Sequence, residues 1–212
     1  MRARSVAFVG ALWLTGCGTN RPEIPPELLG QSGCQANDYP NGPYGGEPGE
    51  LVKNMCFQGF RAPDASQARS RAASLDSVAF SNFYDPEGTT YELLLVNSSA
   101  IWCSACRIEH ETLPQHQTEL GPHGLVVLSA LFQDAKSNPA VTDDLVVWVE
   151  TFQPNFPMVL DPDYQLGAFA SAETAPLNLV VDARTMRIVE KFIGDQSSVL
   201  WPFIENELSQ RE

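Results

Sequence analysis

The order of the apolar segments in residues 91–208 is the feature that most restricts how this chain can fold. Short apolar runs typical of buried strands alternate with segments whose apolar residues recur every three or four positions, as on one face of a helix. The predicted strands cover residues 91–97, 124–131, 158–160, 177–181 and 187–193. The predicted helices cover the residues after 102, residues 145–152 and residues 200–208. This order predicts an α/β sandwich whose consecutive parallel strands are joined by right-handed crossovers.

Prolines set the expected limits of two of these helices. The apolar residues between Leu145 and Phe152 follow helical spacing, and Pro154 should end that helix. Pro202 falls within the closing helix and is tolerable only near its first turn, because proline has no backbone N–H to donate.

Length and charge exclude several classes of protein. A chain of 212 residues with 43% apolar residues fits one domain with an extension. Its 26 acidic and 13 basic side chains give a formal net charge of -13. A negative charge of this size does not attract the negatively charged phosphate backbone, so we expect no nucleic-acid partner.

The first 17 residues predict export. Arg2 and Arg4 precede an apolar run over residues 6–14, which is far shorter than the roughly 20 residues of a membrane-spanning helix. The run ends in Leu-Thr-Gly-Cys at residues 14–17, which resembles the lipobox of bacterial lipoproteins. The resemblance implies that residues 1–16 are a signal peptide and that Cys17 is the lipidated first residue of the mature chain. An ordinary cleaved signal with a chance cysteine, or an uncleaved anchor, is the alternative.

The same resemblance implies a location in the cell envelope, with the chain anchored by lipid and facing the periplasm. Gly18 stands where enteric lipoproteins that stay at the inner membrane have Asp, so the outer membrane is slightly favoured. The acidic balance of the chain repels anionic lipids, so acyl chains and not lipid charge would hold it at the membrane.

Four cysteines remain for disulfide chemistry: Cys34, Cys56, Cys103 and Cys106. Of three possible pairings, spacing favours Cys34 with Cys56 as a structural disulfide and Cys103 with Cys106 as a redox pair. The longer loop would restrict the unfolded chain by roughly 3 kcal/mol. The alternative is that the first pair resolves the second in trans. Prolines and glycines are frequent in residues 20–50, so we expect a tether over residues 17–33 and a loop-rich extension over residues 34–75.

The residues Trp102 to Cys106 carry the predicted chemistry. Two cysteines at i and i+3 in the first helical turn place their sulfurs within reach of a disulfide. Cys103, at the helix N-terminus, should have a pKa below the ~8.5 of a free cysteine, and Cys106 should be the buried resolving thiol. Haem attachment would need His where Arg107 stands. The three histidines form no second cluster for a structural zinc, which stays a minor alternative.

These residues resemble the thioredoxin superfamily over roughly residues 76–209, with Ala175-Pro176 before a late strand as a further match. Asn97, Glu109 and residues 156–161 (Phe-Pro-Met-Val-Leu-Asp) resemble the TlpA/ResA-like branch of envelope thiol-disulfide oxidoreductases. The resemblance implies a thioredoxin-like domain over residues 76–212, in which helices flank a central mixed sheet. It implies a thiol-disulfide oxidoreductase whose partners are exported proteins with thiols or disulfides, and a membrane electron donor or other thiol reductant. We expect neither a metal nor another cofactor.

The branch also implies roles for the residues around the cysteines. Glu109 becomes the proton acceptor for Cys106, with an exposed helix glutamate as the alternative. Pro176 is expected in a cis peptide bond, with the backbone of Ala175 pairing with an extended substrate. Trp102 is expected to shield the disulfide, and simple packing is the alternative.

The sequence departs from this pattern at several points. Ser104 and Ala105 lack the proline common between such cysteines, and Pro114 lies later than the usual helix kink. Arg107 would either stabilise the Cys103 thiolate or lie on a solvated face. A peroxiredoxin-like antioxidant is an alternative function, although its characteristic Pro and Thr upstream of the cysteine are absent. A non-catalytic binding lipoprotein with the same fold, including one with a copper site, is another.

Overall fold

The structure is a computed structural model that describes residue 34, residues 38–170 and residues 174–211. The predicted signal peptide, the lipid anchor at Cys17 and the tether over residues 17–33 lie outside the described residues. The helices are α1 (Ala68–Arg71), α2 (Ser104–Leu120), α3 (Thr142–Phe152) and α4 (Ser197–Ser209), and the 3₁₀ turns are η2 (Phe80–Asn82), η3 (Gly121–His123) and η4 (Gln165–Phe169). The strands are β1 (Cys56–Phe60), β2 (Asp76–Ala79), β3 (Leu93–Ala100), β4 (Leu125–Gln133), β5 (Met158–Leu160), β6 (Leu177–Asp182) and β7 (Arg187–Ile193).

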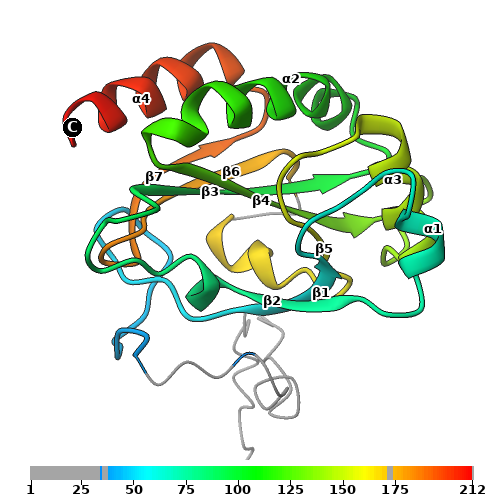
Figure 1. Cartoon of the computed structure of the whole chain (residues 1–212), viewed down its shortest axis with the longest axis horizontal. Helices are drawn as coiled ribbons and strands as arrows, with labels where there is room; N and C mark the ends of the chain where they lie inside the picture. The colour runs from blue at the N-terminus through cyan, green and yellow to red at the C-terminus, as the bar shows by residue number, and fades with distance from the viewer. Residues whose placement is uncertain (1–33, 35–37, 171–173, 212) are drawn as a thin grey trace, which may run out of the picture.

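One mixed sheet of seven strands organises the molecule, in the order β2-β1-β5-β4-β3-β6-β7 (Figure 1). The pairs β3–β4 and β4–β5 are parallel, and the other neighbours are antiparallel. Every residue of β3 is buried, as expected for an apolar strand at the centre of a sheet that is covered on both faces. The prediction of a central mixed sheet with flanking helices is confirmed.

The structure differs from the expected loop-rich extension at β1. This strand lies within residues 34–75, yet it pairs with both β2 and β5 and is therefore part of the central sheet. Gly59 permits the pairing, because a Cβ at this position would collide with the backbone of Met158 and Val159. This strand of five residues contains glycine and glutamine and has no apolar run, so its sequence pattern does not predict a strand.

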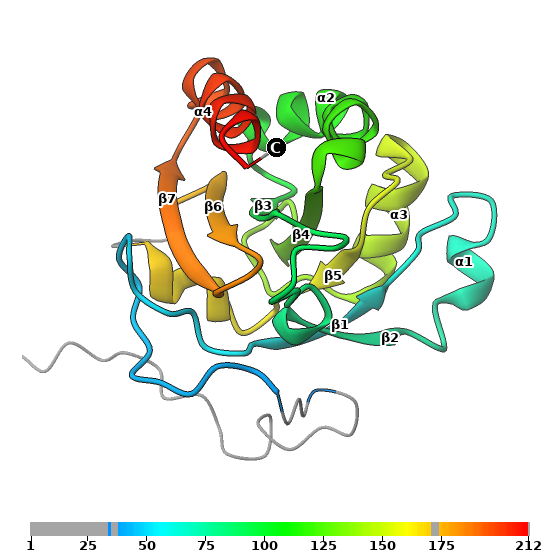
Figure 2. The same cartoon turned by 60° about the vertical axis from the view of Figure 1, so that its left-hand side comes forward.

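The two faces of the sheet are covered differently (Figure 2). Helices α2, α3 and α4 pack on one face, where Leu113, Trp148 and Ile204 enter a buried apolar cluster. The segment before β1, together with η2 and η4, covers the other face with a second apolar cluster. Two backbone hydrogen bonds hold this segment beside β7: the N–H of Val52 donates to Met186 and the N–H of Ile188 to Glu50, both at 2.9 Å.

Helix α4 begins earlier than its proline suggests. Pro202 is the sixth residue of the helix and not part of its first turn, which corrects the expectation from the sequence. The backbone carbonyl that loses its partner belongs to Ser198, an exposed residue, so water can solvate it.

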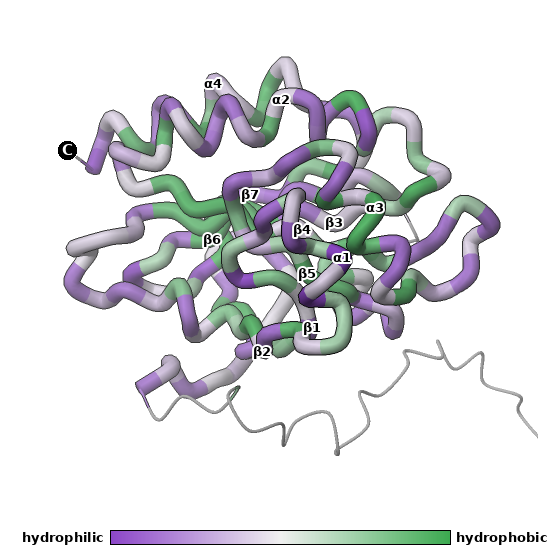
Figure 3. The backbone as a smooth tube through the Cα atoms, turned by 45° about the vertical axis from the view of Figure 1, so that its right-hand side comes forward, coloured by the Kyte–Doolittle hydropathy of each residue, from purple (hydrophilic) through white to green (hydrophobic). Residues whose placement is uncertain are grey.

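Hydropathy follows these layers. Along α2 and α4, hydrophobic and hydrophilic residues alternate as expected for helices with one face on a core (Figure 3). Within the described part of the chain, no helix combines the length and apolar character needed to span a bilayer.

Candidate redox site

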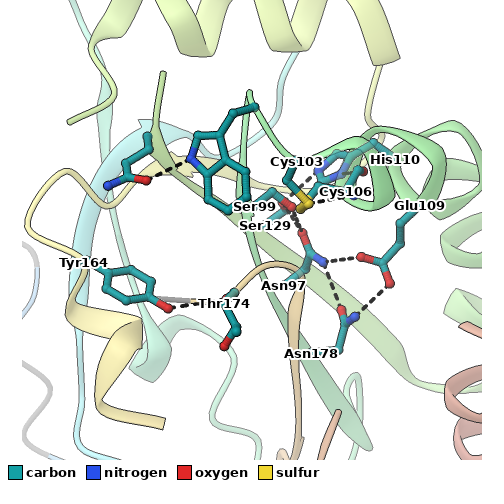
Figure 4. Close-up of a disulfide and its surroundings, with 12 residues drawn as sticks. Asn97, Ser99, Cys103, Cys106, Glu109, His110, Ser129, Tyr164, Thr174 and Asn178 are labelled. Carbon is teal, nitrogen blue, oxygen red and sulfur yellow. Dashed lines mark hydrogen bonds between the residues drawn. A yellow bond between two sulfur atoms is a disulfide. The ribbon is translucent and has the colours of Figure 1, made fainter. Parts of the chain in front are cut away.

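Cys103 and Cys106 form a disulfide at the amino end of α2, directly after β3 (Figure 4). Their Cα atoms are 5.3 Å apart. Cys103 is the N-cap residue of the helix, with extended backbone angles, and its Sγ accepts a hydrogen bond of 3.1 Å from the N–H of Cys106. A thiolate at Cys103 would meet the same N–H and the positive end of the helix dipole, and both stabilise an anion.

The two cysteines differ in access. Cys103 keeps 5% of its surface exposed, whereas Cys106 has none. A molecule in solution can therefore contact Cys103, whereas Cys106 is covered by the protein.

Glu109 lies on the buried side of α2 and is only 3% exposed, which rules out the alternative of an exposed helix glutamate. The side-chain amide of Asn97 on β3 donates to its Oε2 at 2.8 Å, and that of Asn178 on β6 donates to its Oε1 at 2.7 Å. Burial raises the pKa of Glu109 to about 7, the two amide hydrogen bonds oppose that rise, and the negative charge of Asp195 adds to it. The result is a carboxyl group that can exchange a proton near neutral pH.

The polar contacts continue from Asn97 toward a buried histidine. The hydroxyls of Ser99 and Ser129 each donate to Oδ1 of Asn97 at 2.8 Å. Ser129 also lies 3.0 Å from Nε2 of His110, whose Nδ1 is 2.9 Å from the backbone oxygen of Cys106. Burial lowers the pKa of His110 to about 4, so this imidazole is neutral at pH 7.

Sequence reasoning missed most of this network. From the sequence, His110 is a candidate only for a zinc ligand, and no role is predicted for Ser99, Ser129 or Asn178. The available signal was the presence of polar residues inside otherwise apolar strand runs, since a buried polar side chain in a central strand needs a partner.

Trp102 is 42% exposed, so it is not simply packed in the interior. Its Nε1 donates to Oε1 of Gln133 at 2.8 Å, and its ring meets Phe132 edge-on with centroids 6.3 Å apart. Phe132 in turn stacks on Tyr164 at 4.4 Å. These contacts fix an exposed indole next to Cys103 in the chain.

Ala175 and Pro176 stand directly before β6, and the peptide bond between them is cis. Ala175 packs against the small buried cluster that contains both redox cysteines and Phe132. The structure therefore brings this backbone segment next to the disulfide.

Arg107 is directed toward α3. Its guanidinium carbon lies 5.7 Å from the ring centre of Trp148 and 5.5 Å from that of Phe152. An arginine stacked on aromatic rings is held by cation–π attraction. The guanidinium therefore packs on the aromatic rings of the neighbouring helix α3 and not on Cys103.

Cys34 and Cys56 also form a disulfide, with Cα atoms 5.7 Å apart. The side chain of Asn54 donates to the backbone oxygen of Cys34 at 2.9 Å and accepts from the N–H of Ser81 at 2.9 Å. The disulfide thus joins the start of the described chain to β1. The described residues contain no group of three or more His, Cys, Asp or Glu side chains that could hold a metal ion.

No protein-family model matches the chain. In sequence it is 30% identical over 108 residues to the thiol:disulfide interchange protein DsbE of Pseudomonas fluorescens biotype C. The match covers 50% of this chain and 54% of that protein, so it spans about half the length of the curated relative.

Comparison with solved structures identifies the fold. A structure proposed to be a thiol:disulfide interchange protein DsbE from Chlorobium tepidum superposes with a TM-score of 0.59 at 17% identity, over 76% of this chain and 98% of the other. An exposed lipoprotein thioredoxin from Streptococcus pneumoniae gives a TM-score of 0.52 at 15% identity, over 73% and 99%. This chain has the thioredoxin fold and is similar in sequence, over about half its length, to a thiol:disulfide interchange protein. Within this fold, the helix that starts at the cysteine pair follows a central strand, and the segment before β6 lies beside it.

Proposed function

We propose that this chain is a thiol-disulfide oxidoreductase that acts on exported proteins in the cell envelope through Cys103 and Cys106. The observation that carries the proposal is the disulfide at the start of α2, with its accessible member at the N-cap and its buried member one turn before the buried Glu109. A nucleophile, a resolving thiol and a proton acceptor are what thiol-disulfide exchange requires.

In the reductive direction, the Cys103 thiolate attacks one sulfur of a substrate disulfide. A mixed disulfide forms, and the other substrate sulfur leaves as a thiolate that takes up a proton. Cys106 then loses its proton and attacks Sγ of Cys103, which closes the enzyme disulfide and releases the second substrate thiol. Two electrons pass from the dithiol to the substrate, and a membrane donor or another thiol reductant must restore them. Oxidation of substrate dithiols is the same path in reverse.

Glu109 is the proposed acceptor for the Cys106 proton. Both residues lie on α2 three positions apart, which places them on one face of the helix. A carboxyl group whose pKa is about 7 is ionised often enough at neutral pH to accept a proton and can return it when the reaction reverses.

Trp102 and the backbone of Ala175 and Pro176 are the proposed substrate-binding surface. An extended substrate segment would pair with the backbone before Pro176 as an added strand, and the exposed indole of Trp102 would cover the reacting sulfurs. Trp102→Ala should raise KM for insulin more than it lowers kcat, as measured by the steady-state rate of insulin reduction.

Reduction of insulin disulfides with dithiothreitol as donor tests the activity. The wild-type chain should accelerate the reaction and Cys103→Ser should not, whereas an inactive wild-type chain would overturn the proposal. Cys106→Ser should accumulate mixed disulfides with envelope proteins, because the resolving thiol is gone. Absence of any trapped species would count against a general exchange role.

The proposed location is the periplasmic side of the envelope, with Cys17 as the lipid anchor and the outer membrane slightly favoured. The support is the Leu-Thr-Gly-Cys sequence at residues 14–17 and the likeness to an exposed lipoprotein thioredoxin. Incorporation of a labelled fatty acid tests it: the wild-type chain should be labelled and Cys17→Ser should not. Equal labelling of both would remove Cys17 as the anchor.

A further inference from the structure

A chain of hydrogen bonds runs from the backbone of Cys106 to the carboxylate of Glu109 by way of three buried side chains. It passes through His110 on α2, Ser129 on β4 and Asn97 on β3 (Figure 4). None of these three side chains is exposed to solvent. Their hydrogen atoms must therefore be shared among the partners within the network.

The positions of those hydrogens follow from the partners. Nδ1 of His110 faces a carbonyl oxygen, which can only accept, so Nδ1 carries the hydrogen and donates it. The amide nitrogen of Asn97 uses both hydrogens, one to Oε2 of Glu109 and one to Oδ1 of Asn178. Nε2 of the neutral His110 is then an acceptor, and so is Oδ1 of Asn97.

Ser129 has one hydroxyl hydrogen and two acceptors within reach. Oδ1 of Asn97 lies at 2.8 Å and Nε2 of His110 at 3.0 Å, so the hydroxyl can satisfy only one of them at a time. When it donates to Asn97, the amide is polarised and its N–H binds the Glu109 carboxylate more strongly. When it donates to His110, Oδ1 of Asn97 keeps only the hydrogen bond from Ser99, and the polarisation of the amide is weaker.

We propose that His110 is a positioning residue that competes with Asn97 for the single hydroxyl hydrogen of Ser129 and so controls how firmly Asn97 holds the Glu109 carboxylate. The inference rests on the exchange function proposed above, in which Glu109 is the proton acceptor. It adds that His110, Ser129 and Asn97 together set the strength of the hydrogen bond to Glu109. No proton travels through the asparagine; only the orientation of the Ser129 hydroxyl changes.

Asp195 and Arg107 are charged residues near the network. Glu109 faces uncharged Asn97 on β3 and Asn178 on β6, and it feels Asp195 from the segment between β7 and α4. Trp148 and Phe152 of α3 pack against His110, and Arg107 lies over the same two rings. Burial keeps the imidazole of His110 neutral, which leaves Nε2 free to accept.

Two substitutions should move the Glu109 titration in opposite directions. His110→Asn keeps a short amide donor for the Cys106 carbonyl but removes Nε2, so Ser129 donates to Asn97 alone and the pKa of Glu109 falls. Ser129→Ala removes one of the two hydroxyl donors to Oδ1 of Asn97 and leaves Ser99 as the other, so the pKa of Glu109 rises. If cooperative strengthening of a charged hydrogen bond is about 10–30%, each shift is roughly 0.2–0.6 pH unit.

The titration is measured in two ways. The acid limb of the pH profile of kcat/KM for insulin reduction reports the Glu109 titration through activity. The carboxyl stretch in infrared spectra, assigned by its loss in Glu109→Gln, reports it without activity. A wild-type chain that titrates but reduces no disulfide would overturn the proposed function and leave the network intact. His116→Asn, on the same helix but stacked on Trp201 outside the network, is the matched control and should shift nothing.

The double variant decides between competition and general loosening. If His110 acts only through Ser129, then His110→Asn added to Ser129→Ala should produce no further shift. If the substitutions only loosened the core, water would enter and stabilise the ionised Glu109 carboxylate. The pKa of Glu109 would then fall in both single variants. Shifts of the same sign, or a full His110→Asn effect in the Ser129→Ala background, would overturn the proposal.

Discussion

The two disulfides of this molecule are chemically the same bond in two different environments. Cys103 and Cys106 are three positions apart at the start of a helix, whereas Cys34 and Cys56 are separated by 22 positions and join a chain segment to β1. The first pair has a helix N-terminus and a buried carboxyl group beside it. Among the described residues, the side-chain amides of Asn54 and Gln165 donate to the backbone oxygens of Cys34 and Cys56, and neither amide titrates.

The comparison indicates what makes a disulfide reactive. Exposure alone does not distinguish the pairs, because Cys34 and Cys103 are both largely buried. In the proposed function the difference is that the helix stabilises a thiolate at Cys103 and that Glu109 takes the proton that Cys106 must lose.

The strongest test removes the nucleophile. Cys103→Ser should reduce insulin-disulfide turnover to the uncatalysed rate, because a serine hydroxyl at neutral pH is neither ionised nor able to form a mixed disulfide. Circular dichroism should show an unchanged fold. If the variant kept most of the wild-type rate, Cys103 would not be the nucleophile, and loss of that rate on removal of Cys34 and Cys56 would reverse the comparison.

Glu109→Gln should slow turnover by about 100-fold or more, the usual size of a general acid–base contribution, and should remove the acid limb near pH 7. Turnover that kept its acid limb would exclude Glu109 as the acceptor.

The same variant changes how stability depends on pH. The folded pKa is raised from 4.5 to about 7, so the wild-type chain loses stability as pH rises through that window, when the unfolded chain releases a proton that the folded chain retains. The amide does not titrate. The stability of the variant relative to wild type should therefore rise by about 3 kcal/mol between pH 4.5 and 7. Urea unfolding at several pH values measures this difference, and the contribution of His110, which has the opposite sign, is present in both chains and cancels.

Removing the other disulfide should affect stability and not chemistry. The double variant Cys34→Ser/Cys56→Ser should lose about 2–4 kcal/mol of unfolding free energy under oxidising conditions, since it frees the loop that the disulfide closes. Exchange by the folded fraction, measured in glutathione buffer, should match wild type. A large fall in that rate would instead support resolution of the active disulfide in trans by this pair.

The sequence predicts the parts of this comparison that depend on local pattern. Strands β5 and β7 have the predicted bounds, and the cysteine pair at the start of α2 follows from its spacing alone. Strand β1 could not be predicted in this way, because Cys56–Phe60 becomes a strand only through pairing with β2 and β5. The same holds for Ser129 and Asn178, which meet Glu109 and its neighbours only after three strands are aligned. Contacts between residues distant in sequence are what a single sequence does not contain.

The smallest predicted effect concerns the charge beside the cysteines. Arg107→Met keeps the length of the side chain but not its attraction to Trp148 and Phe152, so stability should fall by about 0.5–1 kcal/mol. The pH dependence of Cys103 alkylation by iodoacetamide in the reduced chain should not change, because the guanidinium lies on α3 and the thiolate is stabilised by the start of α2. A rise in the apparent pKa of Cys103 in this variant would mean that a side-chain charge, in addition to the helix terminus, separates the reactive pair from the structural one.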